Sequence, residues 1–459
     1  MDPLDDFLNQ LNQCINSSPE EVSILLNPNV RVNQHLVRLN GLNINQKSLQ
    51  SIIDSKHFFD DEWLAFNELV ISFVSLARDL DPWSSLASFD LFTTFLNDLS
   101  IAFSNNNRGH YLTLLVRSSI DIILPMAIQL DFQLYHKEDC LQPRLSYLAS
   151  LFLKMFNNIR SQSLISNNKK TIILLLGNKL CNVYFKLGNP LLCQNIFSNM
   201  NNANLNFNSF TVNEQIQYRY YLARFYLIKN SLANSYIHLN WCLQQITNSS
   251  TNQNIDIILK YLIPVSILMG KRPNFTYIAH TYYQSKNLQI PSFIFHYQKI
   301  QQAIKLGNYN LFIDCFNEPS IKQELIKNGL YILIGQKSIV LLIRNLIKKV
   351  WILLGKPSRI SYHQIHIALQ LSISSKYQNS GYDMFSFLQL PIQDSTIENL
   401  LITLISQTLM KGKLSSNQQS VALAKMNVFP PVDSVYFVLF GNGSESNLNH
   451  NDKWMMSSN

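Results

Sequence analysis

Five cationic side chains and no acidic one lie in the sixteen residues RNLIKKVWILLGKPSR, at positions 344–359. Arg344 and Lys348 are four residues apart, and on a helix two like charges at that spacing cost a few tenths of a kcal/mol. Lysine and arginine without a matching carboxylate are the side chains that contact phosphates. The segment therefore indicates either a contact with a negatively charged partner or the solvated side of a core helix.

The positive charge of the whole chain is concentrated in the same region. Residues 320–425 contain twelve Lys and Arg against four Asp and Glu, an excess equal to the net charge of +8 carried by all 459 residues. A neutral body with one basic segment predicts a local contact with a polyanion. The nucleic-acid-binding candidates are Lys337, Arg344, Lys348, Lys349, Lys356, Arg359, Lys411, Lys413 and Lys425.

Two other interpretations of these cations stay open. The charges can simply solvate the outside of buried helices, or they can meet an acidic protein instead of a nucleic acid. Arg344 has a role of its own to consider, because an arginine beside an apolar stripe can pack its stem and brace the domain. No aromatic residues alternate with the lysines as in single-strand stacking platforms, so any nucleic-acid contact is expected to be to the backbone, with little sequence preference.

The sequence contains no recognisable catalytic or cofactor-binding motif. A glycine-rich phosphate loop, G-x-S-x-G and H-E-x-x-H are all absent. His363 and His366 stand three apart on one predicted helix, but no Cys, Asp or Glu near them completes a set of metal ligands. The sequence therefore predicts a protein that is not an enzyme and that holds no cofactor or metal ion.

The first element that must position the cations is a helix over 338–354. Its apolar residues recur at three- and four-residue spacing, which is the helical period. At about 100° per residue, Lys337, Arg344, Lys348 and Lys349 fall on one flank of this helix. The pattern predicts a cationic flank beside a buried apolar stripe.

The segments after this helix predict the rest of a small domain over residues 320–435. SRISYHQIHIALQL reads as a helix capped by Ser358 or Ser361, and a loop at 376–393 follows it. DSTIENLLITLISQTLM reads as a third helix, with a capping box from Asp394 or Ser395 to Glu398. A short two-stranded ribbon after Leu414 completes the outline of a winged helix.

The remainder of the chain is expected to be helical. Gly and Pro are scarce, at 13 and 15 residues, and helix–turn–helix patterns recur irregularly between 171 and 310. These features predict a mainly all-α fold, a degenerate tetratricopeptide-like solenoid ending in a winged helix. The expected parts are an N-terminal helical region at 1–165, a solenoid at 166–319, the winged helix at 320–435 and a disordered tail at 436–459. Within the N-terminal region, Asp81 is expected to cap a helix that starts at Pro82.

Other features bear on where the protein works. Six cysteines without C-x-x-C spacing indicate structural thiols in a reducing compartment. The acidic start MDPLDDFLNQ lacks the layout of a signal peptide, and no apolar run reaches the length of a membrane span. An intracellular soluble protein without a membrane contact is expected.

The chain resembles a known family, the PCI-domain proteins of the proteasome lid, the signalosome and initiation-factor complexes. The matching segments are YRYYLARFYL, YLIPVSILMGKRP, AIKLGNYNLF, LIRNLIKKV and IENLLITLISQTLMKGKL. Within the family, ARDLDPWSSLASFDLF, CQNIF and VFPPV are similar to the fungal PCI subunit of the nuclear complex that couples transcription to mRNA export. The resemblance covers roughly residues 60–435, and the loop at 376–393 departs from the family pattern.

The resemblance implies a non-enzymatic scaffold or adaptor subunit. It implies a large scaffold subunit and a small acidic disordered subunit as partners, RNA or DNA bound through winged helices, and action in the nucleus at the nucleoplasmic face of the nuclear pore. The alternative within the same family is a signalosome-associated assembly subunit whose winged helix makes protein contacts only.

Overall fold

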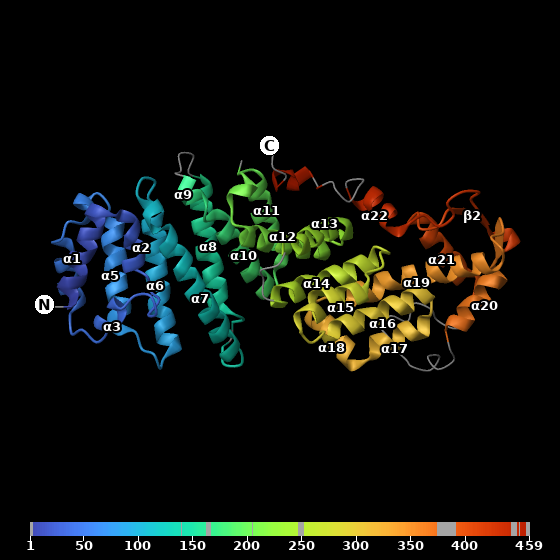
Figure 1. The fold of residues 1–459 in the computed structure, drawn as a ribbon, viewed down its shortest axis with the longest axis horizontal. Coiled ribbons are helices and arrows are strands. Elements are labelled where there is room, and N and C mark those ends of the chain that lie inside the picture. The colour runs from blue at the N-terminus through green and yellow to red at the C-terminus, as the bar shows by residue number, and fades with distance from the viewer. Residues whose placement is uncertain are drawn as a thin grey trace. The chain divides into compact units, whose positions relative to one another are not determined.

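The computed structural model describes residues 3–138, 140–161, 167–203, 205–246, 252–373, 392–441, 448 and 450–455. The chain divides into two compact units, one of residues 1–221 and 454–459 and the other of residues 222–453. Helix α12 (Val212–Ile228) begins in the first unit and ends in the second. Figure 1 shows that both are built mainly from helices, which confirms the predicted fold class.

The first unit is a series of helices in which successive members pack side by side. Helix α5 packs on α6, α6 on α7, α7 on α8 and α8 on α10 (Figure 1). The apolar spacing explains the packing: Phe66, Leu69 and Phe73 lie on one face of α5 and are fully buried. The α-helices are α1 Pro3–Ser17, α2 Val22–Leu25, α3 His35–Arg38, α4 Gln46–Asp54, α5 Leu64–Asp79, α6 Ser85–Phe103, α7 Thr113–Gln133, α8 Pro143–Ser161, α9 Asn167–Lys170, α10 Ile173–Lys186 and α11 Cys193–Asn201. The 3-10 helices are η1 Pro19–Glu21, η2 Phe58–Asp61, η3 Gly109–Leu112, η4 Pro190–Leu192 and η5 Phe207–Ser209.

Helix α6 starts later than the sequence predicts. The Asp81 carboxylate accepts a hydrogen bond from the Trp83 backbone N–H at 2.9 Å, which forms a turn before the helix. Ser84 occupies the N-cap, and its hydroxyl accepts from the Ala87 N–H at 3.4 Å. The predicted cap at Asp81, with Pro82 as the first helical residue, is wrong. The Asp81 carboxylate closes the turn that precedes the helix, and Ser84 caps the helix itself.

One helix corrects the expectation that no apolar run is long enough for a membrane span. Residues Gly109–Gln133, which form η3 and α7, are long and apolar enough to cross a membrane by length and composition. In the fold, α7 packs against α6 and α8, and Leu115, Val116 and Ile120 are fully buried. Its apolar character is accounted for by its place in the helical core.

Lys169 is a buried lysine whose charge depends on pH. Its ammonium donates to the Asn105 carbonyl at 3.0 Å and lies 4.8 Å from the centre of the Phe103 ring. Burial lowers the pKa of Lys169 to about 8, whereas the unfolded chain keeps the ordinary value near 10.5. Between these two pH values the unfolded state binds more protons, so the stability contributed by Lys169 rises with pH.

We therefore expect wild type to gain stability relative to Lys169→Met when the pH is raised from 7.5 to 9.5. Urea denaturation at both pH values measures the difference, with Lys170→Met as the neighbouring control. A pH-independent difference between wild type and Lys169→Met would contradict the assignment.

The second unit continues the helical pairing. Helix α13 packs on α14, α14 on α16, α16 on α17, and α19 on α14, α16 and α17. The α-helices here are α13 Leu232–Gln245, α14 Asn252–Leu268, α15 Phe275–Tyr282, α16 Ser292–Leu306, α17 Tyr309–Asn317, α18 Pro319–Lys327, α19 Tyr331–Leu353, α20 Tyr362–Ser372, α21 Asp394–Ser406 and α22 Val432–Phe440. The 3-10 helices are η6 Gln284–Lys286 and η8 Ser416–Gln418, and η9 His450–Met455 ends in the first unit.

A three-stranded antiparallel sheet, rather than a two-stranded ribbon, follows α19. The strands are β1 (Arg359–Ser361), β2 (Gly412–Ser415) and β3 (Ser420–Leu423), in the order β1-β3-β2. Strand β1 was missed because three residues are too few to show an alternating pattern. Along the chain the order is α19, β1, α20, α21, β2 and β3. Of the predicted loop at 376–393, positions 376–391 lie outside the described residues.

The two predicted helix caps have different outcomes. The Ser361 hydroxyl accepts from the Gln364 N–H, and the Gln364 side chain accepts from the Ser361 N–H, so a capping box begins α20 and the prediction is confirmed. The predicted capping box from Asp394 or Ser395 to Glu398 is wrong, because Gln393 is the N-cap of α21 and its side chain makes no capping hydrogen bond. Asp394 accepts from the Gln419 amide at 2.9 Å and Glu398 from the Tyr362 hydroxyl at 3.1 Å, so both carboxylates hold α21 to other elements.

The described part of the C-terminal tail is folded, which corrects the prediction of disorder over 436–459. Helix α22 packs on α13. Asp452, in η9, is 2% exposed and its carboxylate accepts from the Tyr226 hydroxyl at 2.5 Å. The His238 Nε2 lies 3.3 Å from the same carboxylate oxygen. The contacts of Asp452 with Tyr226 and His238 therefore hold the polar segment η9 in place.

Candidate polyanion site

Helix α19 carries four of the predicted cationic residues, Lys337, Arg344, Lys348 and Lys349. Its apolar stripe is buried, with Leu342, Ile343 and Ile347 at most 2% exposed. The stripe packs against α14, α16 and α17 on one side and α20 and α21 on the other. The flank next to this stripe carries Arg344 and Lys348, as the helical period predicts.

Arg344 is a buried brace within this arrangement. Its side chain is 5% exposed and donates to the carbonyls of Leu409 at 3.2 Å and Pro430 at 2.6 Å. The guanidinium also donates to the Asn345 side-chain oxygen at 3.2 Å and lies 5.8 Å from the centre of the Phe429 ring. Burial lowers the pKa of Arg344 below its ordinary value. The packing role considered from the sequence is therefore the one that these contacts support.

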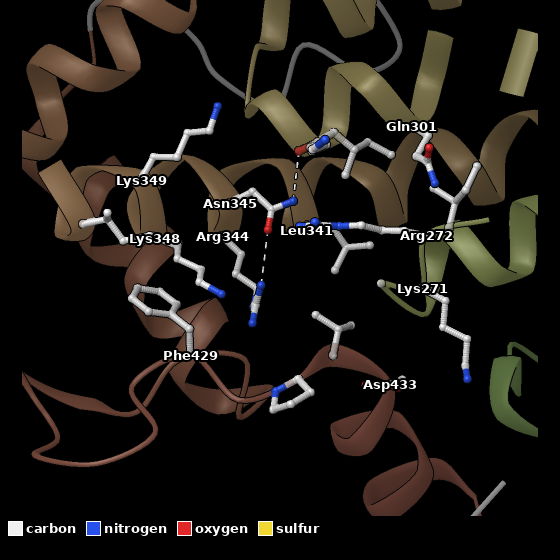
Figure 2. A pocket seen from close by; sticks show the side chains of 17 residues that line it. Lys271, Arg272, Gln301, Leu341, Arg344, Asn345, Lys348, Lys349, Phe429 and Asp433 are labelled. Atoms are coloured by element: carbon white, nitrogen blue, oxygen red, sulfur yellow. Dashed lines mark hydrogen bonds between the residues drawn. The ribbon is translucent and has the colours of Figure 1, made fainter. Parts of the chain in front are cut away.

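A pocket of about 720 Å³ lies beside Arg344, and we call it the basic pocket (Figure 2). Three walls form it: the end of α14 with the turn after it, the end of α16 with α19, and the segment 429–433. Six cationic side chains and one carboxylate, that of Asp433, line it. The cations are Lys271, Arg272, Lys305, Arg344, Lys348 and Lys349.

The electrostatics of the pocket favour an anion. Burial is the main cause that lowers the pKa of Lys348, and the charges of Arg344 and Arg272 lower it further. Figure 2 shows Lys348 directed toward the Arg344 and Phe429 side of the pocket. An anion placed between these cations would relieve their repulsion.

Two of the lining cations have protein partners. The Lys349 ammonium donates to the Leu306 carbonyl at 2.8 Å. The Lys271 ammonium lies 4.6 Å from the centre of the Tyr236 ring and 5.9 Å from that of Phe437. These two residues tie the walls of the pocket to their surroundings.

The remaining predicted cations lie elsewhere, and none of them lines the basic pocket. Arg359 on β1 and Lys413 on β2 both pair with Ala422 on β3, so their side chains share one face of the sheet. Lys411 and Lys425 flank these strands and are exposed. We call Arg359, Lys411, Lys413 and Lys425 the sheet-face cations. The opposite face carries Ile360 and Val421, which are fully buried.

Lys356 and Lys337 belong to neither group. Lys356 is exposed, in the turn between α19 and β1, with its ammonium 6.0 Å from the centre of the Trp351 ring. Lys337 is half-buried on α19, outside the basic pocket. The structure thus divides the predicted cationic residues into a pocket group and a sheet-face group, with these two apart from both.

Sequence reasoning missed Lys271, Arg272 and Lys305 as site residues. All three lie before residue 320, outside the basic segment. A signal was present, since Lys271 and Arg272 follow the helix end at Gly270 in LMGKRP and Lys305 stands in the last turn of α16. Cations at helix ends meet one another only when the fold brings those ends together.

Among the residues that the structure describes, no group of three or more His, Cys, Asp and Glu side chains is placed to hold a metal ion. His363 and His366 lie on α20, three residues apart as predicted.

Comparison with known proteins shows which proteins this chain is similar to in sequence. No family model matches the sequence. The chain is 28% identical over 392 residues to nuclear mRNA export protein THP1 of Saccharomyces cerevisiae, covering 80% of this chain and 84% of that protein. A PCI domain-containing protein of Schizosaccharomyces pombe is 24% identical over 434 residues, covering 92% and 93% of the two chains. A CSN12 homolog of Mycosarcoma maydis is 25% identical over 55% of this chain and 52% of its own. The resemblance predicted from the sequence is thereby confirmed, since the chain is similar to PCI domain-containing proteins and to a nuclear mRNA export protein of yeast.

Proposed function

We propose that this protein is a non-enzymatic adaptor subunit of a nuclear mRNA export complex, which links transcription to export at the nucleoplasmic face of the nuclear pore. The observation that carries the proposal is the similarity to the nuclear mRNA export protein THP1, which aligns over most of both chains. The helical solenoid would hold a large scaffold subunit and a small acidic subunit. Solenoids of this kind bind extended partners along their surface.

The sheet-face cations are proposed to contact the phosphates of RNA or DNA. Arg359 and Lys413 project from the same face of the sheet on either side of a small alanine, and Lys411 and Lys425 extend the charge along the strand ends. The Arg359 guanidinium donates to the Gln418 side chain at 2.7 Å, which orients it over the turn between β2 and β3. Side chains in this arrangement reach a backbone and not base edges, so binding should be tolerant of sequence.

A second candidate is an assembly subunit of a signalosome-type complex. CSN12 homologs from two fungi match 55% and 59% of this chain. This similarity favours the assembly function for the part of the chain that it covers. In this case the sheet would make protein contacts only. The two candidates differ in whether the sheet-face cations affect nucleic-acid binding or assembly.

Replacing Lys411 and Lys413 together by glutamine is expected to lower the salt dependence of nucleic-acid binding. Each phosphate contact contributes about 0.7 to 0.9 to the slope of log K against log salt concentration, so the pair should lower it by about 1.5. Fluorescence anisotropy with a labelled single-stranded RNA across a salt series measures the slope. Lys327→Gln, an exposed lysine on α18, is the matched control and should leave the slope unchanged.

The same double variant also separates the two candidates. Reduced RNA binding with intact assembly on the scaffold subunit supports the adaptor. An unchanged slope in a folded variant that no longer assembles would overturn the phosphate contact and favour the assembly subunit.

A further inference from the structure

We propose that the basic pocket binds a compact polyphosphorylated small molecule, separate from the nucleic acid proposed for the sheet face. The chemical class is several phosphates close together on a small frame. An inositol polyphosphate, a nucleoside triphosphate and inorganic polyphosphate all supply this chemistry.

The first support is the convergence of cations from distant segments on one pocket that is open to solvent. Arg272 comes from the turn after α14, Lys305 from the last turn of α16 and Lys348 from the middle of α19. Arg272 and Lys305 are exposed and Lys348 is half-buried, so all three can be reached from solvent. In Figure 2, Arg272 and Lys348 lie on opposite sides of Arg344 and Asn345.

The second support is the imbalance of charge within the pocket. Asp433 is the one acidic residue among the residues that line it. The depressed pKa of Lys348 reflects burial beside the two arginines. Because the charges of Arg344 and Arg272 both act unfavourably on the Lys348 ammonium, an anion of high charge bound among them would be stabilised.

The third support is that the pocket is held in shape by its own contacts. Asn345 donates to the Ile304 carbonyl at 2.9 Å and accepts from Arg344, which in turn donates to the Pro430 carbonyl. Gly270 has φ of +74°, and a Cβ there would lie 2.5 Å from the Cβ of Val432. The turn that carries Lys271 and Arg272 therefore lies directly against the segment 429–433. A preformed pocket loses little entropy when it binds a small ligand.

The arrangement fits a compact anion better than a nucleic-acid strand. A strand carries one phosphate per nucleotide, so it matches cations spaced along a track. Here the cations surround a single volume of about 720 Å³, which is the size range of small-molecule sites. Ile304, Leu341 and Val432 form apolar parts of the wall that bound the space between the charges.

The test is isothermal titration calorimetry of the intact protein at 0.15 M salt, with inositol hexakisphosphate, ATP and tripolyphosphate as separate probes. At least one probe is expected to bind with one-to-one stoichiometry, and the order of their affinities identifies the source of the phosphates. Arg272→Glu and Lys348→Glu should each weaken that binding at least tenfold. Lys327→Glu, the same charge change outside the pocket, should change it less than twofold.

Lys348→Gln is the milder variant in case Lys348→Glu does not fold, and circular dichroism reports folding for each. The proposal is overturned if no probe saturates at one per chain, or if Lys327→Glu weakens binding as much as Arg272→Glu. It is also overturned if Arg272→Glu abolishes RNA binding and leaves the binding of every phosphate probe unchanged, because the pocket would then belong to the nucleic-acid surface.

Discussion

Gly307→Ala is expected to destabilise the second unit by about 3 kcal/mol, from left-handed strain and overpacking together. Gly307 ends α16 with φ of +63°, a conformation that costs a residue with a side chain about 1–2 kcal/mol. An added Cβ would lie 2.8 Å from the backbone nitrogen of Leu346 and 2.9 Å from its Cα. Backbone atoms of a packed helix cannot rotate away, so α16 and α19 must separate.

Gly329→Ala is the matched control for this substitution. Gly329 lies in the same unit and has φ of +68°, but nothing lies within 4 Å of an added Cβ. Its cost should be the conformational one alone, about 1–2 kcal/mol. Urea denaturation followed by circular dichroism compares the two free energies of unfolding. Equal losses in the two variants would show that α16 and α19 are not in the close contact described.

Arg344→Met is the second substitution with a large expected effect, also about 3 kcal/mol of destabilisation. The variant keeps most of the side-chain volume but removes the donors to Leu409 and Pro430. A buried carbonyl left without a donor costs about 1–3 kcal/mol, and two are left here. Arg344→Lys should be nearly as harmful, because an ammonium lacks the planar fork that reaches both carbonyls.

Arg359→Met tests the same chemistry on the exposed face of the sheet. Removing that guanidinium should change the free energy of unfolding by no more than about 0.5 kcal/mol, since Arg359 is exposed. If Arg344→Met left stability unchanged and weakened RNA binding instead, Arg344 would be a phosphate contact and not a brace.

Helical periodicity in the sequence was sufficient to predict the elements that carry the cations. The spacing of Ile339, Ile343 and Ile347 predicted both the helix and the flank on which Arg344 and Lys348 lie, because a buried stripe repeats with the turn of the helix. The Ser361 cap followed from local chemistry in the same way. These features depend on residues within a few positions of one another.

Features decided by tertiary contacts were not predictable in this way. The Glu398 carboxylate had a local use in a capping box, but it bonds Tyr362 on another helix instead. Lys271 and Lys305 are separated from Lys348 by tens of residues, and only the packing of α14, α16 and α19 makes them one pocket. A charge count along the chain detects the basic segment but not the pocket.

The most direct test of the proposed function is to purify the tagged protein from a nuclear extract of its own cells and identify the chains that accompany it. As an mRNA export subunit, it should bring down a large scaffold chain and a small acidic chain in fixed proportion, together with mRNA. Recovery of signalosome subunits in fixed proportion, without an export scaffold, would contradict the proposal.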